Sequence, residues 1–275
     1  MKNSILPLAL FVSSVPLVHA ATNITFESPY DTAAALSTGA TAPTNTTTNR
    51  AFDGQQGWSR STSGNGGNII TTTTSGNYTG GQALTGSTAA GTSSSLDTYI
   101  GGKAVVGPMT SLVFDFRYYG VELGVGGWND AEAVPDGLFD QTEAQFMAGI
   151  VSSSGFKFGV RGANFGTRYS TGTVGTPGNW YRMTITPDSV AKTVTLGVFD
   201  LTANTAVALG TSVFTLTTLT TDFGVATTAY EGISARVTSY AAAPAAIDNI
   251  QVIPEPAAAL LGGLGMLSLL RRRRN

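Results

Sequence analysis

An acidic stretch near the middle of the chain carries the residues best suited to hold a cation. Asp130, Asp136, Asp140 and Glu143 follow Trp128 at short intervals. Carboxylate oxygens on a loop suit Ca²⁺, which takes about six to eight oxygen ligands. The stretch lacks the Asp-x-[Asp/Asn]-x-[Asp/Asn]-Gly pattern of a calcium-binding loop, so the alternative is a solvated surface loop. We interpret the four carboxylates as candidate calcium ligands.

The same carboxylates permit a second chemistry, the hydrolysis of glycosidic bonds. That reaction needs two carboxyl groups held about 5–10 Å apart, one as acid and the other as base or nucleophile. Asp140 and Glu143 are the nearest pair and are expected on a loop or a short helical turn. Exposed carboxylates are more often plain surface charge. A carboxylate-based polysaccharide hydrolase or lyase is therefore the alternative function.

Aromatic side chains offer a way to bind carbohydrate without catalysis, because their faces pack well on the apolar faces of sugar rings. Trp58 and Trp128 are the preferred candidates, since both stand among Gly, Asn and Gln residues. Tyr118 and Tyr169 are further candidates. The alternative for all four is packing in the core or at its rim. Trp180 stands within a strong strand pattern and is assigned to packing.

Composition removes several classes of enzyme. The chain has no cysteine, and its one histidine, His19, lies in a segment that we expect to be removed. Disulfides, thiolate sites, Ser-His-Asp chemistry and histidine-bound zinc, copper or iron are thereby excluded for the mature chain.

The charge of the chain also narrows its partners. Five of the 15 basic residues and one of the 17 acidic residues lie in the two terminal segments described below. Residues 21–253 therefore keep 10 basic and 16 acidic residues, a net charge of −6. No basic stripe favours nucleic acid as a partner.

The elements that would position the candidate residues are short strands. Apolar and polar residues alternate, β-branched residues are frequent and turn residues separate the runs, whereas helical periodicity is almost absent. In the clearest run, Tyr181, Met183 and Ile185 share one face and Arg182 and Thr184 the other, and a turn is expected at Pro187-Asp188. We predict strands at residues 23–27, 68–74, 112–119, 145–151, 156–161, 180–186, 193–200, 206–215, 231–239 and 246–252.

Two of these runs resemble a known architecture. Residues 180–199 are similar to the Trp-Tyr-Arg-x-Thr-x-Thr … Val-Thr-Leu-x-Val-x-Asp strand pair of laminin-G-like and concanavalin-A-like jelly rolls. Asp248-Asn249-Ile250 resembles the final strand of many such domains and of carbohydrate-binding modules. The resemblance implies an all-β fold, with one antiparallel β-sandwich (jelly roll) over residues 21–253. It also implies that one strand pairs the two chain ends and that Asp248-Asn249 bonds a neighbouring turn.

One departure from the jelly-roll enzymes bears on catalysis. Laminarinase-type jelly rolls carry Glu-x-Asp-x-x-Glu or Glu-x-Asp-x-Glu on one strand. Neither pattern occurs at any glutamate of this chain. This difference counts against a hydrolase of that type, and we interpret the protein as a non-enzyme.

The first 20 residues are typical of a secretory signal peptide. Lys2 gives the positive start, residues 5–18 are apolar and Val18-His19-Ala20 forms a small-residue cleavage site. We expect cleavage after Ala20, so that the mature chain begins at Ala21. The alternative is an uncleaved membrane anchor.

Residues 254–275 combine three features that concern a membrane. Pro254-Glu255-Pro256 precedes an apolar run at residues 257–270. The run is shorter than the roughly 20 residues of a usual membrane span. A buried helix would not explain the arginines that follow, and a membrane-surface helix would need a polar face. Those arginines predict a cytoplasmic end and are Arg271, Arg272, Arg273 and Arg274.

In this order and at the chain end, the three features resemble the PEP-CTERM sorting signal of Gram-negative bacteria that produce exopolysaccharide. The resemblance implies recognition by an exosortase, a membrane cysteine protease-transferase, with processing near residues 254–256. It also implies a transient inner-membrane anchor through the C-terminal helix, followed by delivery to the cell surface or extracellular matrix. It covers about a tenth of the chain and implies nothing about the activity of the remainder.

Together these observations favour an exported, non-catalytic β-sandwich protein that is structural or binds extracellular polysaccharide. A polysaccharide hydrolase or lyase on the same fold is the alternative, and a plain adhesin or matrix filler without a small ligand is a third hypothesis. Ca²⁺ at the acidic stretch is the one cofactor that the sequence suggests.

Overall fold

A computed structural model of the chain describes residues 22–24, 69–72, 82–85, 96–104, 109–129, 144–163, 166–188, 190–217, 231–239 and 245–254. The predicted signal peptide and the predicted apolar segment at residues 257–270 lie outside these ranges. Within the described ranges, no helix has the length and apolar character needed to cross a bilayer.

The described residues form short strands along the whole chain. The strands are β1 (Thr22–Ile24), β2 (Ile69–Thr72), β3 (Gln82–Thr85), β4 (Leu96–Ala104), β5 (Met109–Arg117), β6 (Leu123–Asn129), β7 (Ala144–Ser152), β8 (Phe156–Arg161), β9 (Arg168–Ser170), β10 (Trp180–Asp188), β11 (Thr193–Asp200), β12 (Thr205–Ala206), β13 (Val213–Thr215), β14 (Glu231–Ser239) and β15 (Ala246–Pro254).

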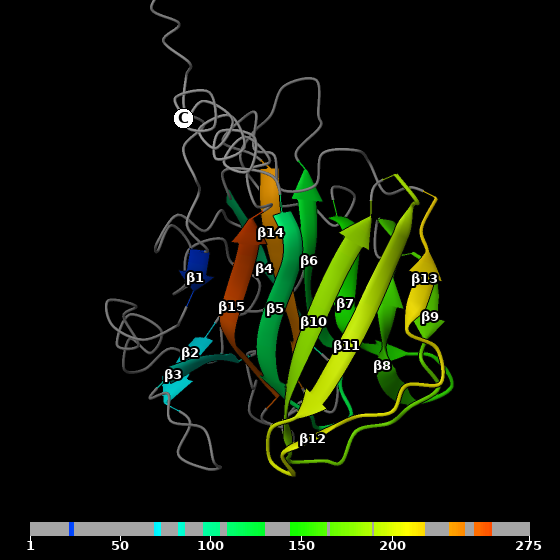
Figure 1. The fold of residues 1–275 in the computed structure, drawn as a ribbon. Coiled ribbons are helices and arrows are strands. Elements are labelled where there is room, and N and C mark those ends of the chain that lie inside the picture. The colour runs from blue at the N-terminus through cyan, green and yellow to red at the C-terminus, as the bar shows by residue number, and fades with distance from the viewer. Residues whose placement is uncertain are drawn as a thin grey trace, which may run out of the picture.

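These strands pair antiparallel and form two sheets that lie face to face (Figure 1). The nine-stranded sheet has the order β12-β11-β10-β5-β15-β3-β2, with β1 beside β15 and β13 beside β11. The six-stranded sheet has the order β4-β14-β6-β7-β8-β9. The predicted all-β class and antiparallel β-sandwich are thereby confirmed.

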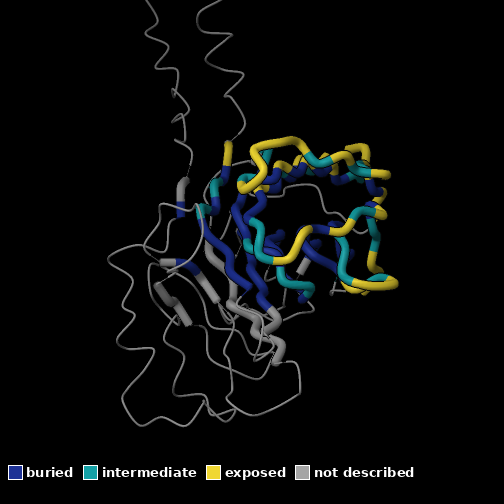
Figure 2. Tube along the Cα trace, turned by 90° about the horizontal axis from the view of Figure 1, so that it is seen from below, coloured by how far each residue is buried: buried dark blue, intermediate teal, exposed yellow. Residues whose placement is uncertain are grey.

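The core lies between the two sheets, because each strand turns alternate apolar side chains inward. Along β10 the residues alternate, with Tyr181, Met183 and Ile185 buried and Arg182 and Thr186 exposed, as predicted. Figure 2 shows the buried stretches inside the packed strands and the exposed stretches along the outside. The opposing sheet contributes buried side chains that include Leu123, Val125, Phe146, Ala148, Ile150, Phe158, Val160, Ile233 and Val237.

A group of aromatic rings joins the two sheets in the core. The ring of Phe158, from the six-stranded sheet, lies 5.1 Å from that of Tyr181 and 6.2 Å from that of Phe116, both in the nine-stranded sheet. Tyr181 also stacks on Phe116 at 5.7 Å. Each such pair contributes about 0.5–1.5 kcal/mol beyond the stabilisation that comes from burying its apolar surface. These rings therefore fix how the two sheets face each other.

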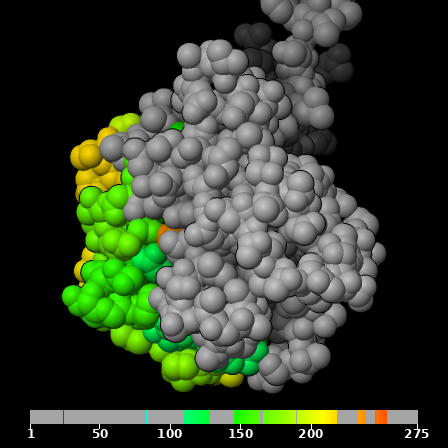
Figure 3. Space-filling view, turned by 180° about the vertical axis from the view of Figure 1, so that it is seen from behind, coloured from blue at the N-terminus to red at the C-terminus, as the bar shows by residue number. Residues whose placement is uncertain are grey.

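One side of the sandwich is closed by the chain between β12 and β13. The Thr173 hydroxyl donates to the carbonyl of Ala208 (3.1 Å), and the Thr211 amide donates to the carbonyl of Thr171 (3.2 Å). These bonds tie the loop after β9 to the segment before β13. Seen from behind, the green and yellow surfaces of the described residues lie along one side of the molecule (Figure 3).

Several predicted strands have the bounds that the alternation indicated. The runs 193–200 and 231–239 are β11 and β14, and the hairpin over 145–151 and 156–161 is β7–β8. β1 pairs with β15 through Thr22 and Val252, which confirms that one strand joins the N-terminal part of the chain to its C-terminal part.

Two local predictions were wrong. Pro187 and Asp188 continue β10, since they pair with Val194 and Thr193, and the turn follows them. The predicted strand over 206–215 is two short strands, β12 and β13, which both pair with β11. Asn249 bonds Asp115 in the neighbouring strand β5, and the predicted bond from Asp248-Asn249 to a turn stays a prediction.

Candidate functional site

Most of the predicted site residues lie outside the described part of the chain. Trp128 belongs to β6, but its side chain is not described, and Pro254 is the last residue of β15. The calcium, sugar-stacking and processing roles of the remaining residues stay predictions. The residues outside the described ranges are Ala20, Ala21, Trp58, Asp130, Asp136, Asp140, Glu143, Glu255, Pro256, Arg271, Arg272, Arg273 and Arg274. Within the described ranges, no group of three or more acidic, histidine or cysteine side chains has the arrangement of a metal site.

The two tyrosines predicted to stack on sugars are placed against other side chains. Tyr118 is 3% exposed, its hydroxyl donates to the carbonyl of Phe156 (2.8 Å) and its ring lies beside those of Phe158 and Tyr181. Its ring therefore leaves no face for a sugar and serves the core. Tyr169, in β9, is half-buried and lies 6.2 Å from the ring of Phe214.

Burial raises the pKa of both Tyr118 and Tyr181 above the ordinary value of 10.0. A raised pKa means that the folded chain holds these protons more tightly than the unfolded chain. The contribution to stability is therefore complete below pH 10.0 and is lost as the pH rises through the folded pKa values. We expect the urea midpoint of unfolding to fall above about pH 10, with tyrosinate absorbance rising together with unfolding.

The control for this prediction is Tyr118→Phe, which removes one of the two titrating groups. It is expected to be less stable at neutral pH, because the bond to Phe156 is lost, and to have a shallower alkaline decline. A urea midpoint of the original chain that is flat through this pH range would contradict the prediction.

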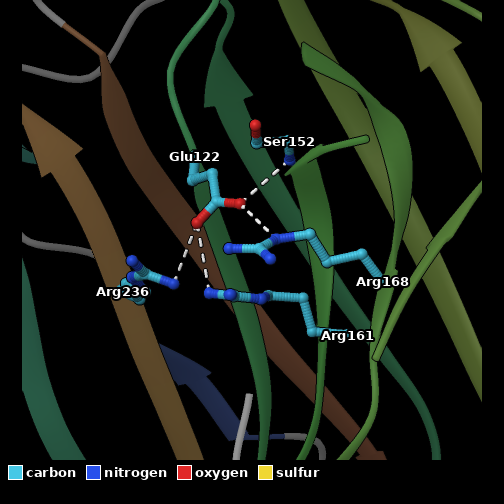
Figure 4. A network of polar contacts seen from close by, with 5 residues as sticks. All are labelled: Glu122, Ser152, Arg161, Arg168 and Arg236. Atoms are coloured by element: carbon cyan, nitrogen blue, oxygen red, sulfur yellow. Dashed lines mark hydrogen bonds and ion pairs between the residues drawn. The ribbon is translucent and has the colours of Figure 1, made fainter. Parts of the chain in front are cut away.

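A network of polar contacts surrounds Glu122, the residue before β6 (Figure 4). Its Oε1 accepts bonds from the Ser152 amide (2.9 Å) and from Nε of Arg168 (3.0 Å). Its Oε2 contacts one guanidinium nitrogen of Arg161 (3.1 Å) and one of Arg236 (3.0 Å). Glu122, Arg161 and Arg236 are at most 6% exposed, whereas the side chain of Arg168 is 42% exposed.

Four members of this Glu122 cluster lie in strands, and Glu122 itself directly precedes β6, which lies between β14 and β7. Ser152 ends β7, Arg161 ends β8, Arg168 begins β9 and Arg236 lies within β14. Backbone hydrogen bonds connect each strand only to its immediate neighbours, whereas this one carboxylate connects groups from several strands. Because removing one partner of a buried ion pair costs far more than the pair contributes, we interpret the Glu122 cluster as a clamp on the sheet.

A row of glycines crosses the sheet beside the Glu122 cluster. Gly124, Gly149 and Gly159 are direct cross-strand partners in β6, β7 and β8. Arg236 continues the row beyond Gly124. A Cβ at any of the three glycines would meet a backbone carbonyl oxygen of the neighbouring strand, so glycine is what the close strand pairing requires. Figure 4 shows Arg161 and Arg168 extending over the strands toward Glu122.

A second ion pair holds the outer face of the nine-stranded sheet. Asp115 is fully buried and accepts two bonds from Arg182, at 2.7 and 2.9 Å. Its Oδ2 also accepts a bond from the Asn249 side chain (3.2 Å), and the Asn249 amide bonds Asp248. Asn249 has φ of +47°, a left-handed conformation that asparagine tolerates well. Asp248-Asn249 therefore links β15 to β5.

The outer face of β10 and β11 is open to solvent and carries a mixed polar and aromatic surface. Arg182 is paired with Phe199, Thr184 with Gly197 and Thr186 with Thr195. Phe199 is 36% exposed and the Arg182 side chain 44% exposed. A Cβ at Gly197 would meet only the Cβ of Thr184, at 3.9 Å, so the surface beside Phe199 is unobstructed by side chains. We call these six residues the β10–β11 face.

Sequence reasoning missed both of these arrangements. Phe199 was assigned to a strand without a role, although its alternation with Val198 already placed it on the outer face. Glu122 stood alone between predicted elements, and no local pattern marked it. Its partners become visible only through the pairing of the strands.

No protein-family model and no curated protein sequence matches the chain. Among solved structures, lectin II from Ulex europaeus is similar with a TM-score of 0.36 and 10% identity, over 68% of this chain and 86% of the lectin. The globular domain of T. cruzi calreticulin is similar with a TM-score of 0.40 and 10% identity, over 79% of this chain and 95% of that domain.

Peanut lectin with a nine-residue peptide is similar with a TM-score of 0.38 and 9% identity, over 85% of this chain and 97% of the lectin. At these TM-scores the similarities carry no inference about function.

Proposed function

We propose that this protein is an exported, non-catalytic β-sandwich that is delivered to the cell surface or exopolysaccharide matrix and binds polysaccharide there. The observation that carries the binding role is the solvent-open β10–β11 face, where Phe199 stands beside Arg182 and the bare surface of Gly197. An extended polysaccharide suits such a face better than a small ligand, because the face is a sheet surface with few enclosing side chains.

The chemistry of the β10–β11 face matches what a sugar chain offers. The ring of Phe199 can pack on the C–H face of a pyranose. The hydroxyls of Thr184, Thr186 and Thr195 both donate and accept hydrogen bonds, as sugar hydroxyls require. The bidentate bond to Asp115 holds the Arg182 guanidinium in one orientation, on the side of β10 that faces β5. These groups favour binding and include no pair of carboxylates.

The buried carboxylates of the described residues support a non-catalytic role. Asp115 and Glu122 are held by arginines, and Asp200 accepts bonds from the amides of Thr202 and Ala203 and from the Asn179 side chain. A fourth buried carboxylate, Asp248, is the cross-strand partner of Asp115 and accepts a bond from the Asn249 amide. These four carboxylates join strands or cap turns within the sheets.

The proposed export and sorting of the protein rest on its two terminal segments. The signal-like residues 1–20 would direct export, and Pro254-Glu255-Pro256 with the apolar run and Arg271–Arg274 would direct recognition by an exosortase at the inner membrane. Pro254 ends β15, so the proposed processing motif begins where the last strand of the sandwich stops. Calcium at Asp130, Asp136, Asp140 and Glu143 is a further part of the proposal.

The binding role is tested by sedimenting the purified chain with insoluble polysaccharides, including the matrix of the producing cells. We expect saturable binding without release of sugar. Phe199→Ala is expected to weaken it about two- to twelvefold, because one aromatic contact contributes about 0.5–1.5 kcal/mol. The matched control is Val174→Ala, which truncates another exposed apolar residue, 56% exposed, away from the β10–β11 face.

Equal binding by the Phe199 and Val174 variants would overturn the assignment of the face. Release of sugar would revive the hydrolase or lyase. Binding that is lost in chelator and restored by calcium would support the predicted calcium site.

A further inference from the structure

The last strand delivers the chain to a fixed point on one end of the sandwich. β15 pairs with β5 as far as Pro254, and the Thr110 hydroxyl donates to the carbonyl of Ile253 (3.0 Å). Only Glu255 and Pro256 separate this point from the apolar run that begins at Ala257. Three residues span at most about 10 Å. If the apolar run enters a bilayer, this end of the sandwich must therefore lie close to the lipid surface.

The turn between β10 and β11 lies at the same end of the nine-stranded sheet. Val252, Leu112, Ile185 and Leu196 form one row across β15, β5, β10 and β11. From this row β15 continues two residues to Pro254, whereas β10 continues three to Asp188 and then turns. In Figure 1 the ends of both strands point the same way. The turn stands about 10–12 Å to the side of Pro254, since neighbouring strands are about 4.8 Å apart.

The tip of this turn presents an apolar side chain to solvent on a rigid support. Val190 is 92% exposed, the highest exposure among the exposed large apolar residues of the described chain, and Ala191 beside it is also exposed. The Asp188 carboxylate accepts bonds from the amides of Val190 (3.0 Å) and Ala191 (2.7 Å). The carboxylate thereby fixes the turn, so that Val190 projects from the end of the sheet.

We propose that this end of the sandwich rests on the lipid surface while the chain is anchored by its C-terminal apolar run, with Val190 in contact with the bilayer. The inference rests on the membrane anchoring in the proposed function and adds an orientation to it. The β10–β11 turn extends beyond Pro254 by one to two residues of strand, about 3–7 Å, within the reach of the three-residue connection. The tip and the anchor can thus meet the same surface at once.

The same fold provides a matched control at the opposite end of β11. Asp200 caps the turn after β11 as Asp188 caps the turn before it, by accepting bonds from the amides of Thr202 (2.9 Å) and Ala203 (2.8 Å). Ala191 and Ala203 hold equivalent positions in these two turns, and both are exposed. Because the chain has no cysteine, Ala191→Cys and Ala203→Cys each give a single labelling site.

The experiment places the full chain in vesicles of phosphatidylethanolamine and phosphatidylglycerol, with an environment-sensitive fluorophore on one of the two cysteines. We expect lipids that carry a nitroxide quencher to reduce the emission at position 191 at least about twofold more than at position 203. Val190→Asp in the Ala191→Cys chain is expected to bring the quenching at position 191 down to the level at position 203.

Two failures can be told apart. If the full chain does not float with the vesicles, the proposed anchoring is overturned, and the orientation with it. If the chain floats but the two positions are quenched equally, the orientation alone is overturned. Quenching at position 191 that survives Val190→Asp would overturn the contact made by Val190.

Discussion

Glu122→Gln is expected to lower the free energy of unfolding by about 3–5 kcal/mol, the usual cost of removing one partner from a buried ion pair. The substitution keeps the shape of the side chain but leaves Arg161, Arg168 and Arg236 facing a neutral amide. The first and last of these are almost fully buried, so water cannot replace the lost charge. Urea unfolding followed by tryptophan fluorescence measures the change.

The matched control is Arg168→Gln, which removes a partner on the exposed side of the same cluster. Its side chain is 42% exposed, and we expect a loss of about 1 kcal/mol or less, as for other solvent-screened ion pairs. Glu122→Gln would remove the negative charge that groups from four strands share, whereas Arg168→Gln removes only the link to β9. Equal losses of unfolding free energy in the two variants would contradict the interpretation that Glu122 holds the strands of this sheet together.

The nine-stranded sheet was the more predictable part of the fold. In β10 and β11 every second residue is apolar and the residues between are mostly polar or glycine, which is the pattern of strands with one wet face. Local alternation was therefore enough to place β11 and to orient Tyr181, Met183 and Ile185. The prediction failed at Pro187 and Asp188, at the end of β10. Their preference for turns was outweighed there by pairing with Val194 and Thr193 of β11.

The six-stranded sheet was harder to predict for a physical reason. β6 has the sequence Leu-Gly-Val-Gly-Gly-Trp-Asn, and glycine lowers the strand propensity of such a run. The glycines Gly124 and Gly126 are nevertheless what the sheet requires, because the neighbouring backbone of β7 lies too close for a side chain. The glycines that prevented the prediction of β6 are thus the residues that allow it to pack against β7.

The candidate sites depended even more on strand pairing. Glu122 meets Arg161 across 39 positions of sequence and Arg168 across 46. No short segment of the sequence contains both partners of such a contact. Single charged residues this far apart also form no repeating pattern from which a contact could be predicted. Only the register of β6, β7, β8 and β9 brings them together. By contrast, the outward position of Phe199 followed from alternation alone, but its exposure and its bare neighbour Gly197 required the structure.

Gly126→Ala is expected to destabilise the protein by about 3 kcal/mol or more, at the upper end of what overpacking costs. A Cβ at this position would overlap the carbonyl oxygen of Phe146 and lie 2.6 Å from the Cα of Met147. Both are backbone atoms of β7, so no side-chain rotation can relieve the overlap. The strands β6 and β7 would have to separate, which also disturbs the ladder from β6 to β14 and the Glu122 cluster at its end.

The control for Gly126→Ala is Gly197→Ala, which makes the same change in a strand of the other sheet. The nearest atom to a Cβ at Gly197 is 3.9 Å away and the position is exposed. Its effect should lie within about 1 kcal/mol of zero and on the stabilising side, because alanine restricts the unfolded chain. Thermal and urea unfolding of the two variants would be compared with the original chain.

A well-folded Gly126→Ala with unchanged stability would show that β6 and β7 are not as closely paired as the structure has them. The positions of the arginines around Glu122 would then have to be reassigned.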